Sequence, residues 1–384
     1  MRWRVGIAVV AIALLPPASR VALAQVASGA AHSGQSSSGN FQSLAARAAA
    51  ARDADNLDEA VSLFRKALAL RPNWVEGWWS LGTLEYDRNQ YAAAAQALGR
   101  MLPLAPKDGT ARVMLGLCEF ELGQDKAALV HLQQGRSMGV ADDPQLQQVA
   151  IFHEGVLLLR AGQYKQAQTT FDAVCKTDTA DDELLDGLGR AVLRRAPGTQ
   201  EDAQTKWLVR RVGKAACLNA EKKYEDAGRL YQDILTEFPN FANLHYAYGV
   251  MLVSANQLPA AVEQFKLQIA QDEAHVAARL EIAANLYKVD SAAALPYAQQ
   301  AVALSPQLPF AHYLLGLLLL EADDYAAAIP ELEIAAKAFP KEKKVFFALG
   351  SAYSRAGRRE EAARARAEFE RLNAESSAET AATY

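Results

Sequence analysis

Residues 78–106 have the sequence WWSLGTLEYDRNQYAAAAQALGRMLPLAP. Its apolar residues recur at steps of three and four, stop at Asn89 and Gln90, and resume at Tyr91. Such steps place apolar side chains on one face of an α-helix. The polar break indicates a turn, and Pro106 ends the second run. The stretch therefore predicts two helices joined by a short turn.

The same small residues return every 34 residues along most of the chain. The columns are Ala60, Ala94 and Ala128; Gly82 and Gly116; Pro72 and Pro106; Gly155 and Gly189; Ala227 and Ala261; Ala294, Ala328 and Ala362; Gly316 and Gly350; and Pro306 and Pro340. Several columns at one period indicate a structural repeat. Because Gly inside a helix costs about 1 kcal/mol relative to Ala, its recurrence needs a packing reason. We expect the glycines to let the backbone of the partner helix come close, opposite the alanines of the second helix.

The pattern W-x2-L-G-x2-Y…A-x3-F…P is that of the tetratricopeptide repeat. The stretch resembles it through Trp78, Leu81, Gly82, Ala94, Leu98 and Pro106, and similar units run from about Phe41 to Leu372. The resemblance implies an all-α fold. It would be an α-solenoid of antiparallel helix pairs in a right-handed superhelix, with about ten repeats and a break near Pro197.

Departures from the period predict the divisions of the chain. Ala167 and Ala227 are 60 residues apart, so one second helix should be shortened or rebuilt within Thr199–Trp207, while Ala261 and Ala294 are one residue closer than the period. The predicted segments are a signal peptide (1–24), a disordered leader (25–40), an N-terminal repeat stack (41–195), an irregular kink (196–207), a C-terminal repeat stack (208–372) and a disordered tail (373–384).

The first residues resemble an export signal. Arg2 and Arg4 precede an uncharged apolar run from Val5 to Leu15, and Ala24 closes a small-x-small site before Gln25. This order is typical of a cleavable secretory signal, and the run is too short to span a bilayer. We expect cleavage between Ala24 and Gln25 and a periplasmic or extracellular mature chain, exported as in the family's bacterial members.

Charge excludes two classes of partner. The chain has 40 basic and 44 acidic residues, and the signal removes three arginines, which leaves a net charge of −7. Binders of nucleic acid or of anionic membrane surfaces are usually basic. We therefore expect neither nucleic-acid binding nor stable membrane insertion.

The three cysteines show no motif spacing. Cys118, Cys175 and Cys217 lie more than forty residues apart, without C-x-x-C. We interpret them as small buried apolar residues, with the alternative, open in an exported chain, that two of them pair or one reacts.

No pattern predicts catalysis. His153 and Glu154 begin like a zinc-protease helix, but that motif needs a second His where Leu157 stands. The other histidines are scattered, and no nucleophile has an adjacent base. The sequence therefore predicts no enzyme, no metal and no cofactor.

A second stripe of the first helices is mostly apolar. In the stretch quoted above, Trp78, Leu81 and Gly82 form the stripe that packs the repeats together. The second stripe is rotated from it by about one residue step of 100°, so it should line the concave side of the solenoid. The candidate groove residues are Trp79, Tyr86, Val113, Leu117, Phe120, Phe152, Val156, Tyr246, Val250, Tyr313, Leu317 and Phe347. Adjacent first helices could bury this stripe between them, or part of it could stay exposed for a partner.

The family also includes clamps that grip a terminal carboxylate with Lys, Asn and Arg on this surface. Here the matching places in the first half hold Trp79, Thr83, Val113 and Leu117, which argues against such a clamp. Arg190 and Arg194 are the nearest basic substitutes, and we interpret them as a solvated helix face.

These observations predict a non-enzymatic exported scaffold or adaptor whose groove binds apolar or amphipathic segments of other proteins. The family's exported members suggest envelope assembly, polysaccharide export or secretion as its setting, by analogy. The alternative is a carrier or sensor for a small lipid-like or peptide ligand in the same groove. The partner's identity and the oligomeric state are left open.

Overall fold

The computed structural model describes residues 34–140, 143–175, 180–198 and 200–382. The predicted signal peptide and leader residues 25–33 lie outside the described residues. All regular secondary structure in the described part is helical, and the chain divides into two compact units, one ending at Asp202 and the next beginning at Ala203. None of the described helices is long and apolar enough to cross a membrane.

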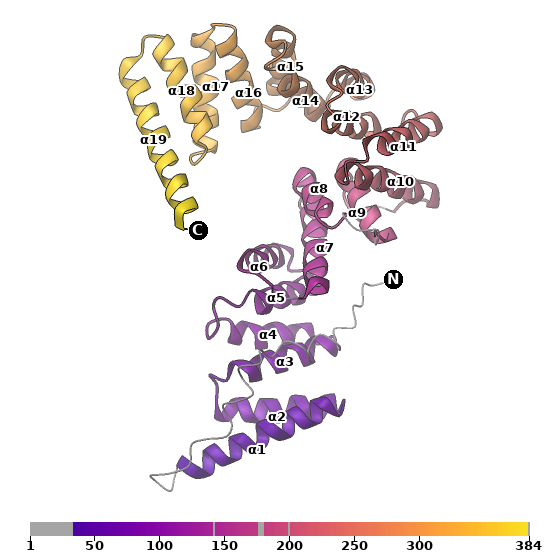
Figure 1. The fold of residues 1–384 in the computed structure, drawn as a ribbon, viewed down its shortest axis with the longest axis vertical. Helices are drawn as coiled ribbons and strands as arrows, with labels where there is room; N and C mark the ends of the chain where they lie inside the picture. Colours follow the sequence, from indigo (N-terminus) through magenta and orange to yellow (C-terminus); the bar gives the residue numbers. More distant parts are fainter. Residues whose placement is uncertain (1–33, 141–142, 176–179, 199, 383–384) are drawn as a thin grey trace. The chain divides into compact units, whose positions relative to one another are not determined.

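The described residues of the first unit form four helix pairs and one further helix. These are α1 (Gly34–Asp53), α2 (Leu57–Leu70), α3 (Val75–Asp87), α4 (Tyr91–Met101), α5 (Gly109–Glu121), α6 (Asp125–Met138), α7 (Pro144–Arg160), α8 (Tyr164–Asp172) and α9 (Asp182–Val192). Each odd-numbered helix up to α7 packs most closely on the next, and each pair then packs on its neighbour (Figure 1). The helix α9 packs on α8 and α7 and has no second helix of its own in this unit.

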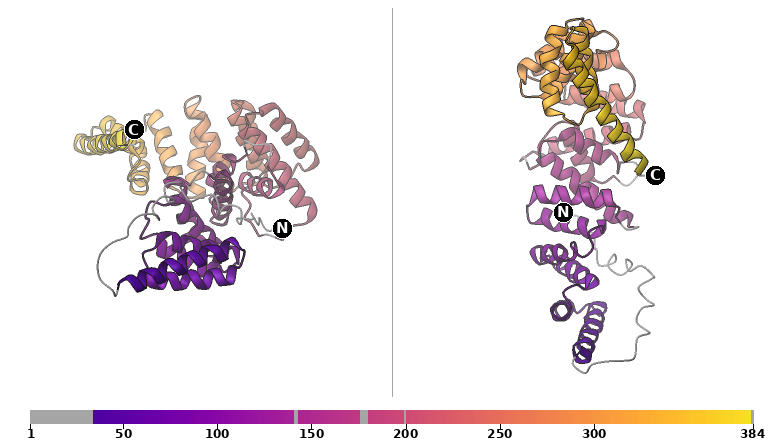
Figure 2. Two further views of the ribbon diagram at one scale, coloured as in Figure 1. Left: turned by 60° about the horizontal axis from the view of Figure 1, so that its bottom comes forward. Right: turned by 90° about the vertical axis from the view of Figure 1, so that its left-hand side faces the viewer.

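The second unit consists of five helix pairs. These are α10 (Ala203–Ala220) with α11 (Tyr224–Glu237), α12 (Leu244–Ser254) with α13 (Leu258–Gln271), α14 (Val276–Leu286) with α15 (Ser291–Leu304), α16 (Pro309–Glu321) with α17 (Tyr325–Ala338), and α18 (Lys343–Arg355) with α19 (Arg359–Ala382). The last four helices lie side by side in Figure 1 and in the left view of Figure 2, and each packs on the next. The nine complete pairs confirm the predicted all-α solenoid of helix pairs.

The turns inside most helix pairs contain a residue in the left-handed backbone conformation. Asp55, Asn89, Gly123 and Gly162 each have a positive φ between the two helices of their pair, and Asn256 does the same in the second unit. Gly, Asn and Asp tolerate this conformation best. The turn between α14 and α15 has no such residue among those described. It is the turn of the repeat that is one residue shorter than the period.

The recurrent glycines make room for a large side chain. A Cβ added to Gly82 would lie 2.8 Å from Cγ of Leu98, and one added to Gly249 would lie 2.5 Å from Cε1 of Phe265. Both neighbours stand four residues after the buried alanine of the second helix. The expected close approach is present, but its nearest atoms belong to this side chain and not to the backbone. At Gly350 the nearest atom is Cγ of Arg366 at 3.4 Å, so at this position no close neighbour requires a glycine.

Helices at both ends extend into segments for which we expected disorder. The helix α1 starts at Gly34, seven residues before Phe41, its first buried residue. The helix α19 continues ten residues beyond Leu372, the last buried one. Asn373 accepts a hydrogen bond from Nζ of Lys343 at 2.8 Å, which ties the extension to α18.

The described residues of the break near Pro197, 193–198 and 200–202, contain no rebuilt second helix. An irregular segment follows α9 from Leu193, and α10 already begins at Ala203, inside the segment predicted to be irregular. The array therefore omits one second helix and goes directly to the next first helix.

Candidate functional site

In the first unit the predicted groove is largely used for packing. Val113 and Leu117 are 0% and 1% exposed and belong to the core cluster shared by α4, α5, α6 and α7. Trp79, Tyr86 and Phe120 are half-buried against the same cluster. Val113 and Leu117 therefore cannot contact a partner, and for them the expectation of an open groove is wrong. Val113 packs against Gly135 of α6, and core residues of α4 and α7 complete the cluster around this part of α5.

Aromatic contacts hold the remaining side chains of this stripe. The ring of Phe120 lies 4.5 Å from that of His153, and the guanidinium of Arg160 lies 4.6 Å from the centre of the Phe120 ring. Phe152 is half-buried, 6.1 Å from the buried ring of Phe171, and Val156 is half-buried beside it on α7. Along its first helices, the described part of the first unit thus offers only the edges of these residues to a partner.

At the start of the second unit, the residues of the predicted groove are also packed against neighbouring side chains. Tyr246 is half-buried, and its ring lies 5.9 Å from Phe265 and 5.1 Å from His275. Val250, one turn further along α12, is half-buried as well.

Toward the C-terminal end of the second unit the stripe opens to solvent. Phe347 of α18 is 62% exposed, and Phe310 at the start of α16 is 45% exposed. Tyr313 and Leu317 of α16 are half-buried against a core cluster formed by α17, α18 and α19. Burial raises the pKa of Tyr313, so its hydroxyl stays neutral at physiological pH.

We define the aromatic patch as Phe310, Tyr313, Leu317, Phe347 and Phe369. The ring of Phe310 lies 6.4 Å from that of Tyr313, and the ring of Phe347 lies 5.5 Å from that of Phe369 on α19. Phe310 and Phe369 were not predicted. Phe310 stands three residues before Tyr313, so a helical-face argument extended by one turn would have included it. Phe369 is on a second helix, where a rule restricted to first helices could not find it.

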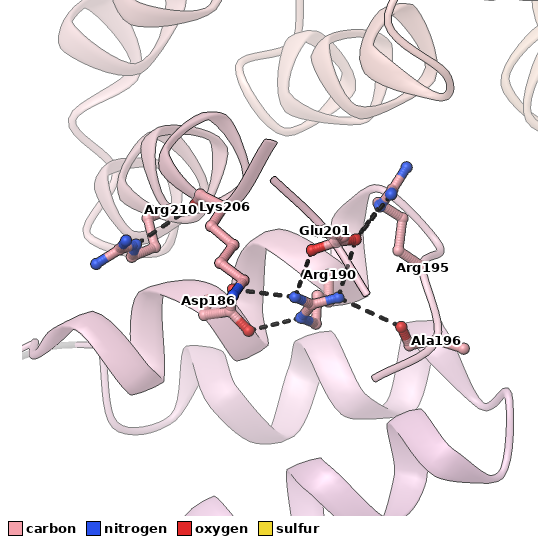
Figure 3. A network of polar contacts seen from close by, with 7 residues as sticks. All are labelled: Asp186, Arg190, Arg195, Ala196, Glu201, Lys206 and Arg210. Atoms are coloured by element: carbon pink, nitrogen blue, oxygen red, sulfur yellow. Dashed lines mark hydrogen bonds and ion pairs between the residues drawn. The ribbon is translucent and has the colours of Figure 1, made fainter. Parts of the chain in front are cut away.

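A buried ion network occupies the place of the missing second helix. Arg190 of α9 is 7% exposed and donates hydrogen bonds through Nε to Asp186 at 2.6 Å and through Nη2 to Glu201 at 2.7 Å (Figure 3). Arg195 donates from Nη2 to the other carboxylate oxygen of Glu201 at 2.7 Å, and Arg190 also donates to the carbonyl of Ala196. Burial alone would lower the pKa of Arg190, but its bonds to Asp186 and Glu201 raise it.

Arg190 and Arg194 therefore form no ligand clamp. For Arg190 the expectation of a solvated helix face is wrong, because the carboxylates of Asp186 and Glu201 enclose its guanidinium. Arg194 is half-buried, and its guanidinium lies 5.4 Å from the centre of the Tyr164 ring. Long-range ion pairing could not be read from the local sequence.

The cysteines differ among themselves. Cys175, after α8, and Cys217, in α10, are both disulfide-bonded, so the interpretation of all three as small buried apolar residues is wrong for these two. Cys118 is a free and fully buried thiol. Burial raises the pKa of Cys118 to about 12, so it is protonated and unreactive at neutral pH.

Among the described residues, no three His, Cys, Asp or Glu side chains are grouped so as to hold a metal ion. The buried histidines are engaged with the protein. Nδ1 of His153 lies 2.8 Å from the carbonyl oxygen of Val149, and His312 contacts Glu331 and the carbonyl of Pro306.

The chain is similar in fold to three solved helical-repeat proteins. These are MamA from Desulfovibrio magneticus RS-1 (22% identity, 45% of this chain and 95% of that one, TM-score 0.39), yeast Tom70 (12%, 86% and 85%, 0.34) and the Cut9–Hcn1 hetero-tetramer of the APC/C (12%, 86% and 87%, 0.36). No curated protein matches the chain in sequence.

A family model described as a tetratricopeptide repeat matches residues 45–109, 80–136, 284–343 and 313–378. These matches lie in both units, on helix pairs that carry the Gly and Ala columns. The chain therefore belongs to the tetratricopeptide repeat proteins.

Proposed function

We propose that this protein is an exported, non-enzymatic adaptor that binds an apolar or amphipathic segment of a partner protein at the aromatic patch. Tetratricopeptide repeat proteins generally mediate protein–protein interactions, and their scaffolds are typically not enzymes. The finer assignment rests on the surface of the second unit.

The observation that carries the proposal is the exposure of Phe347 and Phe310. Large aromatic side chains bury about 150–250 Å² each, so their exposure on one surface costs stability that a partner would recover. The half-buried Tyr313 and Leu317 extend the same surface between them. A helix that presents apolar side chains at steps of three and four fits such a surface.

Two features support export. The N-terminal sequence has the order of a cleavable signal, and Cys175 and Cys217 are disulfide-bonded, a state that persists in oxidising compartments. Within that compartment we place the protein in envelope assembly or secretion.

Replacing Phe347 by Asp should remove partner binding and leave the fold intact, because its side chain is mostly in solvent. The measurement is photo-crosslinking in the native cell from a benzophenone amino acid at position 310, followed by identification of the product. We expect a protein adduct that F347D reduces at least tenfold. The matched control is Val289→Asp, which charges an equally solvated apolar residue (72% exposed) outside the patch.

An adduct of equal yield in F347D and V289D would show that the patch is not the binding surface. A small lipid-like adduct in place of a protein would favour the carrier function over the adaptor.

Export is tested on the mature chain itself. We expect protein recovered from the native cell envelope to begin at Gln25, and its denatured but unreduced form to present one free thiol, that of Cys118. Intact mass with and without thiol labelling measures both. A chain that retains Met1, or three labelled thiols without reduction, would contradict export into an oxidising compartment.

A further inference from the structure

A pocket of about 920 Å³ lies between the second helices of the first two pairs. Residues of α2 and α4 form its walls, and Trp78, Leu81 and Glu85 of α3 line it as well. We call it the α2–α4 pocket. It lies wholly within the first unit and on second helices, whereas the predicted groove follows the first helices.

The pocket is apolar and open. Leu68, Pro72 and Pro103 line it, together with Leu104, which is 42% exposed. The indole Nε1 of Trp78 donates a hydrogen bond to the carbonyl oxygen of Pro72 at 2.7 Å. The polar atom of this ring is therefore already engaged, and the ring presents carbon atoms to the pocket. Several of the residues that line the pocket on α4 are small, so they fill little of it. A Cβ added to Gly99 would meet no atom within 4 Å.

The charge left free at the rim is positive. Glu85 is only 1% exposed and accepts hydrogen bonds from Arg65 at 2.6 Å and from Arg88 at 2.9 Å, so its carboxylate is neutralised inside the fold. Arg100 on the α4 wall is exposed, and no ion pair in the described part of the chain involves it. A ligand that covers the apolar wall therefore meets an unpaired guanidinium.

An exposed apolar ladder continues from the pocket along the unit. Leu70, Leu104 and Met138 are 45%, 42% and 47% exposed, and they follow one another at the 34-residue period near the ends of α2, α4 and α6. Equivalent positions in successive repeats line one edge of a repeat stack. The apolar surface is thus longer than the pocket alone, which favours a chain-like occupant over a compact small molecule.

We propose that the α2–α4 pocket binds an apolar peptide segment of a partner protein that carries an acidic side chain. Its apolar side chains cover Trp78 and Leu104, and its carboxylate pairs with Arg100, which can donate two parallel hydrogen bonds to it. This site is separate from the aromatic patch, and it does not depend on the function proposed for that patch.

The test uses a library of random twelve-residue peptides displayed on phage, selected on the mature full-length chain. Gly99→Trp fills the pocket from an exposed helical position, so it should fold normally and serves for counter-selection. We expect the peptides lost on G99W to combine aliphatic or aromatic residues with Asp or Glu. Their affinity, measured by fluorescence anisotropy, should fall at least tenfold on Arg100→Glu, and exchange of their acidic residue for Lys should restore binding to R100E.

Lys107→Glu is the matched control, because it reverses an exposed charge just beyond the pocket and should change affinity less than twofold. The proposal is overturned if no peptide depends on an open Gly99, if the selected peptides lack acidic residues, or if R100E and K107E have equal effects. Decanoate that displaces the peptides and binds as tightly would overturn the choice of a peptide and assign the pocket to acyl chains.

Discussion

Replacing Glu201 by Gln is expected to lower the free energy of unfolding of the first unit by about 3–5 kcal/mol, because it removes one of the two carboxylates that pair with the buried Arg190 and the carboxylate that pairs with the half-buried Arg195. The Glu201 side chain is 3% exposed and bridges Arg190 and Arg195. Without its charge, the segment from Leu193 to Asp202 loses its attachment to α9. Amide hydrogen exchange should therefore show faster exchange in α9 and in this segment before it does in α3 or α4.

The matched control is Asp125→Asn, which breaks an ion pair of similar geometry in solvent. Nη1 of Arg160 lies 2.9 Å from the Asp125 carboxylate, and both side chains are about 40% exposed. We expect a loss below about 1 kcal/mol. Denaturant unfolding of the full chain measures the loss of unfolding free energy in each variant. Equal losses for E201Q and D125N would show that the buried network does not hold the segment after α9 in place.

The repeat architecture could be predicted because the residues that determine it lie close together in the sequence. One 34-residue unit contains Gly82, which leaves room for Leu98; Ala94, four residues before Leu98; and the turn at Asn89. Each of these three features recurs in other units. One supersecondary unit and its period therefore determine the fold, without knowledge of any distant contact.

The groove could be predicted only in part, because exposure depends on how closely successive repeats pack. Val113 and Phe347 hold equivalent places on their first helices, yet one is fully buried and the other is 62% exposed. Val113 packs closely on Gly135 of α6, which has no side chain in the way, whereas Phe347 faces the ring of Phe369 on α19. A helical wheel shows which face a residue occupies, but it does not show what covers that face.

The ion network and the cysteines could not be predicted, because their partners are set by the break in the period. Glu201 reaches Arg190 only because the chain returns to α9 where a second helix would otherwise stand. The repeat pattern contains no information about a segment that departs from it.

The stability of the first unit should decrease as pH rises through about 7, and Asp172→Asn should reduce this decrease, to which Asp87, whose pKa burial raises to about 6, also contributes. Burial raises the pKa of Asp172 to about 7, and its Oδ1 has no hydrogen-bond partner among the described residues. Its position at the end of α8, where the helix dipole disfavours a negative charge, acts in the same direction.

The sign follows from linkage, because the folded state holds this proton more tightly than the unfolded chain does. Its contribution to stability is therefore complete below about pH 4 and is lost as the pH rises through about 7. A shift of this size corresponds to about 3–5 kcal/mol. The difference in unfolding free energy between D172N and the unmodified chain should be small at pH 4 and should reach this range at pH 8, in favour of the variant. Denaturant unfolding at both pH values measures it, with Glu121→Gln as an exposed carboxylate control. If D172N and E121Q show the same pH dependence, the buried carboxyl of Asp172 does not control the stability of the first unit.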